Sequence, residues 1–161
     1  MARAATTKNR TKAAPRRTSK PSAEKSPPEF CVFCEIVAGR IPSHKVWESR
    51  DFIAFLDIKP IRPGHVLLVP RKHHDSLFDL PAALYERAFR TARTLAAPLG
   101  KHLGVPRVGI VVEGFGVAHA HIHLVPISEA GQLNPALASE ASAEDLQRMR
   151  GTLARVLKSK A

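Results

Sequence analysis

The stretch that decides the fold is His119-Ala120-His121-Ile122-His123-Leu124-Val125-Pro126. In a β-strand alternate side chains point to the same face, so the three histidines are expected to form a row of imidazoles. The residues between them are apolar and would face the core. Because the imidazole pKa lies near neutrality, such a row can supply a nucleophile, a proton carrier or a metal ligand. The alternative is an accidental polar face on an exposed strand.

Four more strands are indicated upstream by short apolar runs. They cover residues 45–48, 52–57, 65–70 and 108–112. The polar Ser49-Arg50-Asp51 between the first two runs is typical of a hairpin. Only Glu113 to Ala118 separates the fourth run from the histidine stretch, which is short enough for antiparallel pairing.

Three helices are expected around these strands. A short one covers Cys31 to Ala38, and the longest covers Ala82 to Leu99, where Pro98 is expected to kink or end it because proline lacks the N–H donor. Ser142-Ala143-Glu144-Asp145 is a capping-box signature that opens a C-terminal helix. The sequence therefore predicts an α+β fold, a five-stranded antiparallel sheet with a central helix and a C-terminal helix.

Most of the net positive charge belongs to a tail. The net charge is +11, and residues 1–28 hold eight Lys and Arg against the single acid Glu24. This segment contains no aromatic residue, so we expect a disordered basic tail, with the folded domain covering residues 29–161. Two alternatives are an organellar transit peptide and weak electrostatic contact with nucleic acid or an anionic surface. No run of about 18 apolar residues exists, so no membrane span is expected.

At this point the sequence resembles the histidine triad (HIT) family of nucleotide-binding hydrolases and transferases. Besides the triad, the resemblance rests on three upstream segments: Cys31-x-x-Cys34 before Ile41-Pro42, Phe55-Leu56-Asp57-Ile58, and residues 63–73, Pro-Gly-His-Val-Leu-Leu-Val-Pro-Arg-Lys-His. It spans about residues 30–127. The family implies the α+β sheet predicted above, usually paired into a homodimer.

The resemblance also implies roles for individual residues. His121 would be the nucleophile that attacks the α-phosphorus, while the other histidines of the catalytic set are His65, His119 and His123; His65 and His123 would orient the nucleophile or contact the phosphate. Neutral imidazole is a good nucleophile near pH 7. Asp57 would accept hydrogen bonds from the ribose, and the base pocket would be lined by Phe33, Ile36, Phe55 and Ile58. Ordinary core packing remains the alternative for these four apolar residues.

The loop before the triad departs from the family pattern. Many relatives carry an asparagine and a Gly-Gln-Ser-type loop, whereas this chain has Val112-Glu113-Gly114-Phe115-Gly116-Val117-Ala118. Polar side chains that help hold the phosphate or protonate the leaving group are therefore missing. Backbone N–H groups at Gly116 and Val117 are expected to bind phosphate instead, because glycine permits close backbone approach.

The cysteine pair has zinc-ligand spacing but supplies only two of four tetrahedral ligands. Zinc-containing relatives are similar in adding two histidines, which map to His73 and His119, with neighbouring His74 as a competitor for the first position. We therefore expect structural Zn²⁺ on Cys31, Cys34, His73 and His119. Reduced structural thiols and a redox pair are the alternatives. Two cysteines also argue against a multi-disulfide secreted scaffold and favour a reducing, cytoplasmic compartment.

The expected function is hydrolysis or transfer at purine nucleoside monophosphate derivatives: phosphoramidates, acyl-adenylates or dinucleoside polyphosphates. The competing hypothesis is a non-catalytic nucleotide-binding, zinc-stabilised interaction module, in which the altered loop has abolished turnover. His44 and His102 are interpreted as surface residues. Residues 128–141, of mixed Gly, Pro, Asn and Ala composition, are considered as a segment that folds over the pocket and tunes its specificity.

Overall fold

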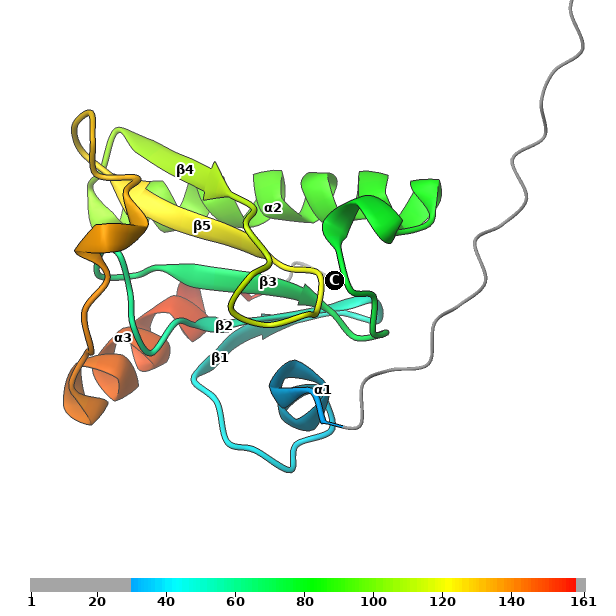
Figure 1. Ribbon diagram of the computed structural model, residues 1–161. Helices are drawn as coiled ribbons and strands as arrows, with labels where there is room; N and C mark the ends of the chain where they lie inside the picture. The colour runs from blue at the N-terminus through cyan, green and yellow to red at the C-terminus, as the bar shows by residue number, and fades with distance from the viewer. Residues whose placement is uncertain (1–29, 159–161) are drawn as a thin grey trace, which may run out of the picture.

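A five-stranded antiparallel sheet carries the histidine stretch near its middle (Figure 1). The structure is a computed structural model and describes residues 30–158; the predictions for residues 1–28 lie outside this range. The strands are β1 (Lys45–Glu48), β2 (Phe52–Leu56), β3 (Val66–Pro70), β4 (Arg107–Val111) and β5 (Ile122–Ile127). Their order is β1-β2-β3-β5-β4, and every neighbouring pair is antiparallel. The predicted fold class is confirmed.

The two faces of the sheet are covered by different helices. The helices are α1 (Val32–Val37), α2 (Ala82–Leu103) and α3 (Ala143–Val156), with short 3₁₀ turns η1 (Leu77–Asp79) and η2 (Pro135–Leu137). α2 and α3 lie behind the sheet in Figure 1, and α1 lies on the other side. β2 is buried along its whole length, because Ala54 packs toward α2 and α3 while Phe55 packs against Phe33 of α1.

The long helix differs from its prediction at the C-terminal end. Pro98 lies inside α2, which continues to Leu103. Proline removes one backbone hydrogen bond, but Leu99 and Gly100 beyond it are buried, and their packing keeps the chain helical. The helix ends instead at Gly104, whose left-handed conformation (φ 65°) is one that glycine adopts without steric cost.

The C-terminal helix begins as predicted. The Ser142 hydroxyl accepts a hydrogen bond from the backbone N–H of Asp145, so Ser142 is the N-cap of α3. Leu146 and Leu153 bury the inner face of α3 in the core. Between residues 30 and 158 no helix is both long and apolar enough to cross a bilayer.

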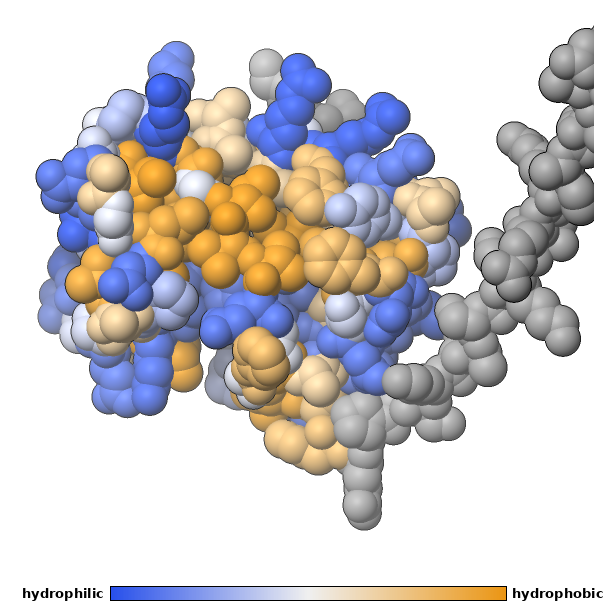
Figure 2. Space-filling model, turned by 45° about the horizontal axis from the view of Figure 1, so that its top comes forward, coloured by the Kyte–Doolittle hydropathy of each residue, from blue (hydrophilic) through white to orange (hydrophobic). Residues whose placement is uncertain are grey.

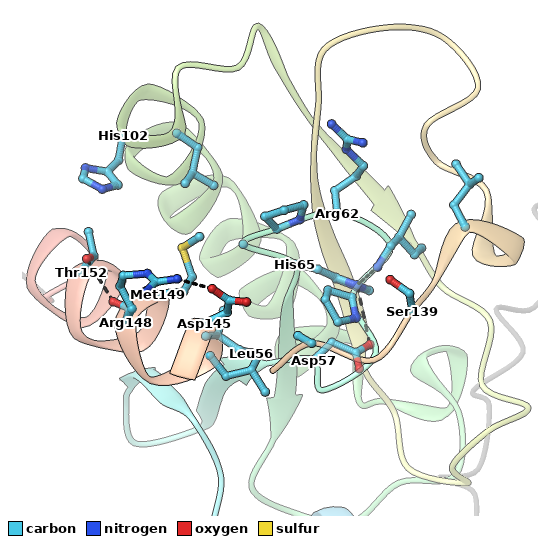
Figure 3. A pocket seen from close by; sticks show the side chains of 18 residues that line it. Leu56, Asp57, Arg62, His65, His102, Ser139, Asp145, Arg148, Met149 and Thr152 are labelled. Atoms are coloured by element: carbon cyan, nitrogen blue, oxygen red, sulfur yellow. Dashed lines mark hydrogen bonds and ion pairs between the residues drawn. The ribbon is translucent and has the colours of Figure 1, made fainter. Parts of the chain in front are cut away.

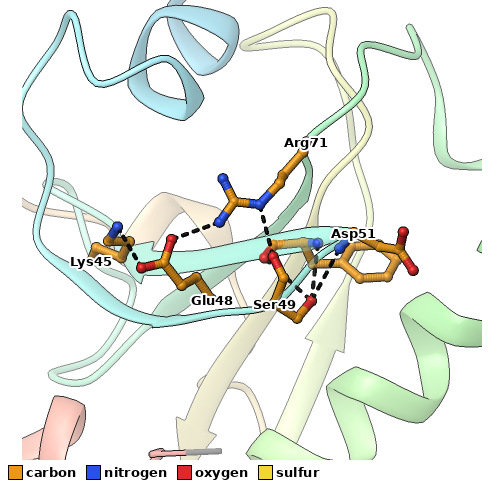
Figure 4. A network of polar contacts seen from close by, with 6 residues as sticks. Lys45, Glu48, Ser49, Asp51 and Arg71 are labelled. Carbon is orange, nitrogen blue, oxygen red and sulfur yellow. Dashed lines mark hydrogen bonds and ion pairs between the residues drawn. The ribbon is translucent and has the colours of Figure 1, made fainter.

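A polar network fastens the β1–β2 hairpin to the end of β3 (Figure 4). Arg71 donates to the Glu48 carboxylate (2.6 Å) and to the Ser49 carbonyl (2.8 Å), and its backbone N–H donates to the Asp51 carbonyl (2.8 Å). Ser49 Oγ also accepts the backbone N–H of Phe52 at 3.2 Å. Because Arg71 directly follows β3, these bonds fix the start of the loop that carries His73.

Candidate active site and metal centre

The triad lies partly outside the strand on which it was predicted. β5 begins at Ile122, so only His123 is in the strand and the prediction of a strand from residue 119 is wrong at its start. The alternation nevertheless continues through the preceding residues. Phe33 of α1 contacts the rings of His119 and His121, with centroids 5.9 Å and 5.2 Å apart. The residues between them, Ala120 and Ile122, are buried in the core on the opposite face. The predicted alternation, with histidines on one face and core residues on the other, is confirmed.

His65, directly before β3, and His123 of β5 form a hydrogen-bonded pair in which the position of each ring proton can be assigned. The backbone N–H of Ile61 donates to Nδ1 of His65 (3.2 Å), so the proton of His65 resides on Nε2. That Nε2 lies 2.9 Å from Nδ1 of His123 and donates to it. The remaining proton of His123 is therefore on Nε2, where it can be donated to a ligand.

Burial keeps both rings of this pair neutral. Desolvation, and then the neighbouring His121, lower the pKa of His65 to about 4; the same causes, in the same order, lower the pKa of His123 to about 4. His65 Nδ1 also lies 3.6 Å from Oδ2 of Asp57, but a neutral ring forms no ion pair there. Since Nδ1 of each histidine accepts a hydrogen bond and Nε2 of each carries a proton, the Asp57–His65–His123 cluster offers only the Asp57 carboxylate to a metal ion.

In His121 the roles of the two ring nitrogens are the reverse of those in His123. Its Nδ1 lies 2.6 Å from the backbone carbonyl of His119, to which only an N–H can donate. The lone pair is therefore on Nε2. The ring is largely buried, contacts the ring of His123 at a centroid distance of 4.8 Å, and borders a cavity. A neutral imidazole with a free Nε2 beside an N–H donor is suited to nucleophilic attack on a phosphoryl group.

The cavity that His121 and His123 face has a volume of about 760 Å³, which is the size of a nucleotide-scale ligand site. The cavity is lined by the five residues that the resemblance assigned to the nucleotide and by the two loop residues expected to bind phosphate: Phe33, Ile36, Phe55, Asp57, Ile58, Gly116 and Val117. Sequence reasoning missed several other lining residues: His44, Lys59, Glu113, Gln147 and Arg150. Gln147 and Arg150 come from α3, and no local signal in the sequence indicates that this helix reaches the cavity.

The remaining histidine of the triad belongs to a different cluster. His119 is fully buried, and its Nε2–H donates to the carbonyl of Pro70 (2.9 Å). Its Nδ1 faces the sulfur atoms of Cys31 (3.4 Å) and Cys34 (3.6 Å). His73 repeats the arrangement, with Nε2 on Asp75 (3.1 Å) and Nδ1 3.3 Å from Cys34 Sγ. The structure thus selects His73 over its neighbour His74.

These four side chains fit a tetrahedral zinc ion. Typical Zn–S and Zn–N bonds of about 2.3 and 2.05 Å place a sulfur and a nitrogen of one tetrahedron about 3.6 Å apart, which agrees with the observed separations. Both histidines present an unprotonated Nδ1 because a carbonyl or carboxylate holds the other nitrogen. Burial lowers the pKa of His119 to about 4, so its ring is neutral; desolvation and the adjacent Cys31 raise the pKa of Cys34 to about 11, so a bound cation must displace its proton.

A second cavity, of about 780 Å³, lies on the other side of Asp57 and His65 (Figure 3). It is lined by the end of α2, by α3 and by Leu137, Ser139 and Ala141, and His102 lies at its edge. Neither His121 nor His123 borders it, so it offers no nucleophile. Residues 128–141 contribute to this cavity and not to the one that His121 faces, so the expectation that they cover the nucleotide pocket is wrong.

Comparison with known proteins agrees with the sequence resemblance. The HIT domain model matches residues 38–130, more than half of the chain. The chain belongs to the HIT domain family. The matched range contains His65, His73 and the triad, whereas α1 with both cysteines precedes it.

Individual HIT proteins extend the similarity to nearly the whole folded part. Protein hit of Bacillus subtilis is 31% identical over 140 residues, 81% of this chain and 97% of that protein. An adenosine 5′-monophosphoramidase of Saccharomyces cerevisiae is 33% identical over 114 residues, 68% of this chain and 70% of that protein. The crystal structure of a zinc-bound histidine triad family protein of Mycobacterium smegmatis has a TM-score of 0.68 and 26% identity, covering 79% of this chain and 92% of that one.

Proposed function

We propose that this protein is a nucleotidyl hydrolase or transferase that cleaves the bond at the α-phosphorus of purine nucleoside monophosphate derivatives through a nucleotidyl-histidine intermediate on His121. The observation that carries the proposal is the hydrogen bond from His121 Nδ1 to the His119 carbonyl, which leaves the Nε2 lone pair available at the cavity. The similarity to a monophosphoramidase supports the reaction class.

The reaction consists of two displacements at phosphorus. In the first, the Nε2 lone pair of His121 forms a P–N bond, and the bond to the leaving group breaks; the leaving group keeps that electron pair and takes a proton from water. In the second, a water oxygen attacks the phosphorus, the P–N bond to His121 breaks, and the water proton is released. Dividing one displacement in two lowers the barrier of each. The products are the mononucleotide and the free leaving group.

The displacements at His121 are assisted by two histidines and by backbone N–H groups. The Nε2–H of His123 donates to a phosphate oxygen, where negative charge develops in the transition state. His65 acts through His123 as a positioning residue, because its own Nε2–H keeps the His123 proton on the side of the phosphate. Backbone N–H groups at Gly116 and Val117 add further donors to the phosphate.

The nucleoside is proposed to occupy the part of the cavity beside α1 and β2. Phe33 and Phe55, whose rings meet edge to face at 5.5 Å, form an apolar wall for the base together with Ile36 and Ile58. Oδ1 of Asp57 accepts the backbone N–H of Lys59, which orients the carboxylate at the end of β2. Its remaining acceptor sites are assigned to the ribose hydroxyls.

Zn²⁺ is assigned a structural role at Cys31, Cys34, His73 and His119. When bound, the ion cross-links α1, the loop after β3 and the segment before β5. His119 is then fixed at both ring nitrogens, and its carbonyl is the acceptor that orients His121. The two cysteines are free thiols in the structure, which accords with the proposed cytoplasmic compartment.

A homodimer is proposed to form through β4. This strand is an edge of the sheet, so its outer backbone groups have no strand partner, and Ile110 and Val112 are exposed (43% and 37%). Figure 2 shows hydrophobic side chains gathered over the side of the molecule that carries β4 and α2. Pairing with β4 of a second copy would cover them. Light scattering after size exclusion should give a dimer for the wild type and a monomer for Ile110→Lys; a wild-type monomer would contradict the assignment.

The decisive experiment mixes the protein briefly with adenosine 5′-phosphoramidate and analyses it by mass spectrometry, followed by AMP release. Wild type should carry a transient adenylyl adduct on His121 and release AMP. His121→Asn should form no adduct and lose turnover by at least about 1,000-fold while AMP binding changes little. Tight AMP binding by wild type without adduct or release, across several substrates, would favour the non-catalytic binding module instead.

A further inference from the structure

The loop between β4 and β5 borders the cavity next to the two histidines. Glu113, Gly114, Gly116 and Val117 all line it. With the nucleoside against α1 and β2, and with His121 attacking in line, the leaving group must depart on the side of the phosphorus away from His121. The loop is one of the walls that remain to meet it there, together with residues 41–44 and with Gln147 and Arg150 of α3.

Glu113 is the one charged side chain of this loop, and it is not engaged elsewhere. It is exposed, and within residues 30–158 its carboxylate forms no hydrogen bond or ion pair. The second acid of the cavity, Asp57, is held by the Lys59 N–H at the ribose end.

The cations of the same cavity lie elsewhere. Lys59 follows β2 and pairs with Glu140 at 3.4 Å, and Arg150 belongs to α3. The loop itself carries no Lys or Arg. A polyphosphate chain leaving past this loop would therefore meet a carboxylate and no compensating cation, which is repulsive.

We propose that Glu113 selects the leaving group by its charge, favouring amines that carry a further positive charge over anionic leaving groups such as nucleoside polyphosphates. The inference rests on the proposed function and names its substrate class. Phe115, 93% exposed between two glycines, adds an apolar and aromatic surface beside the carboxylate. Aromatic faces also attract cations. The loop thus combines two features that suit a cationic amine and lacks the Lys and Arg side chains that suit a polyphosphate.

The bonds that break and form in this step follow from the phosphoramidate structure of the substrate. The P–N bond to the amine breaks as the P–N bond to His121 Nε2 forms, and the amine nitrogen keeps the electron pair and takes a proton from water. Glu113 interacts with a distant charge on the amine and exchanges no proton in this step. Its effect is therefore electrostatic and should depend on ionic strength.

A matched series of substrates tests the proposal. The adenosine 5′-phosphoramidates of cadaverine, n-pentylamine and ε-aminocaproate carry a distal positive charge, no charge and a distal negative charge on chains of similar length. For wild type at low salt, kcat/KM should fall along that order, with about a tenfold ratio between the cationic and anionic members. Diadenosine tetraphosphate should be poorer still, and added salt should shrink the ratio to about twofold.

Variants distinguish an effect of the Glu113 charge from an effect of the overall charge of the protein. Glu113→Gln should reduce the cationic-to-anionic ratio about fivefold, and Glu113→Lys should invert it. Glu86→Gln, which removes an exposed acid on α2 away from the cavity, should keep the wild-type ratio. Thermal unfolding and zinc content of each variant report folding.

The outcomes are distinguishable. A wild type that cleaves all three phosphoramidates with equal kcat/KM, or a ratio that Glu113→Lys leaves unchanged in a folded protein, would overturn the role of Glu113 while the proposed function stands. A wild type that binds AMP but cleaves none of the substrates would overturn both.

Discussion

The two histidine clusters of this fold use the same side chain in opposite ways. In the candidate metal site, Nε2 of His119 and of His73 is tied to an acceptor and Nδ1 is left open. At the cavity, Nδ1 of His121 is tied to a carbonyl and Nε2 is left open. The first arrangement points two lone pairs at a closed site beside thiols, and the second points one lone pair at a ligand-sized cavity. What a histidine does here depends on which nitrogen its partner occupies.

The largest effect is expected from removing one of the proposed metal ligands. Cys34→Ser or His73→Gln should lower zinc affinity by more than about 1,000-fold and the free energy of unfolding by several kcal/mol, because binding free energy at such a site is folding free energy. Zinc titration and thermal unfolding measure both. His74→Gln is the matched control and should keep the metal. Equal zinc affinity in His73→Gln and wild type would show that the cluster is not the site.

The second prediction concerns His65, which supports His123 beside the cavity. His65→Phe removes the N–H that orders His123, while keeping a ring in the buried position. We expect kcat to fall about 10- to 100-fold with KM for the nucleotide substrate little changed, since only transition-state contacts weaken. His102→Gln, at the edge of the second cavity, serves as the control. A variant with wild-type kcat would remove His65 from the catalytic arrangement.

A finer change concerns the partner of a ligand. Asp75→Asn weakens the acceptor that holds Nε2 of His73 at 3.1 Å and should lower zinc affinity about tenfold, far less than loss of the ligand itself. Competition with a fluorescent chelator measures this difference. If Asp75→Asn and His73→Gln were equally damaging, Asp75 would have to be counted among the ligands.

The smallest effect on the His65–His123 pair is expected from a moderate fall in pH. Because burial holds the pKa values of His65 and His123 near 4, ring ¹⁵N chemical shifts of this pair should report neutral imidazoles between pH 8 and about pH 5.5. Stability follows a different course. The unfolded chain binds protons at its ordinary histidine pKa of 6.5, so the free energy of unfolding is highest above that value and falls as the pH drops toward 4. Ring ¹⁵N shifts of His65 and His123 that change to imidazolium values near pH 6.5 in a folded protein would contradict the neutral pair.

The sequence predicted the parts of the site that depend on local pattern. The alternation of residues 119–124 separates chemical from core side chains even where no strand forms, because an extended chain has the same period. The structure brings Cys31, Cys34, His73 and His119 into one cluster and places the seven residues expected to bind the nucleotide around one cavity; their roles stay predictions.

Other features depend on tertiary contacts that leave no local signal. The end of α2 was mispredicted at Pro98, because the burial of Leu99 beyond it outweighs one lost hydrogen bond. The tautomers are set by backbone groups of Ile61, His119 and Pro70, which every sequence possesses. His44 and Arg150 reach the cavity only because distant segments converge on it.

The short helix α1, with its N-cap residue Cys31, contributes residues to both clusters. Cys31 and Cys34 belong to the candidate metal site, while Phe33 and Ile36, offset around the same short helix, line the cavity proposed to bind the nucleotide. A helix of six residues does not persist alone in water, so its position depends on what holds its ends. Occupancy of one site must then bias the other, and thermodynamic reciprocity makes the bias mutual. A bound nucleotide should slow the loss of zinc to a chelator by the factor with which zinc tightens the nucleotide.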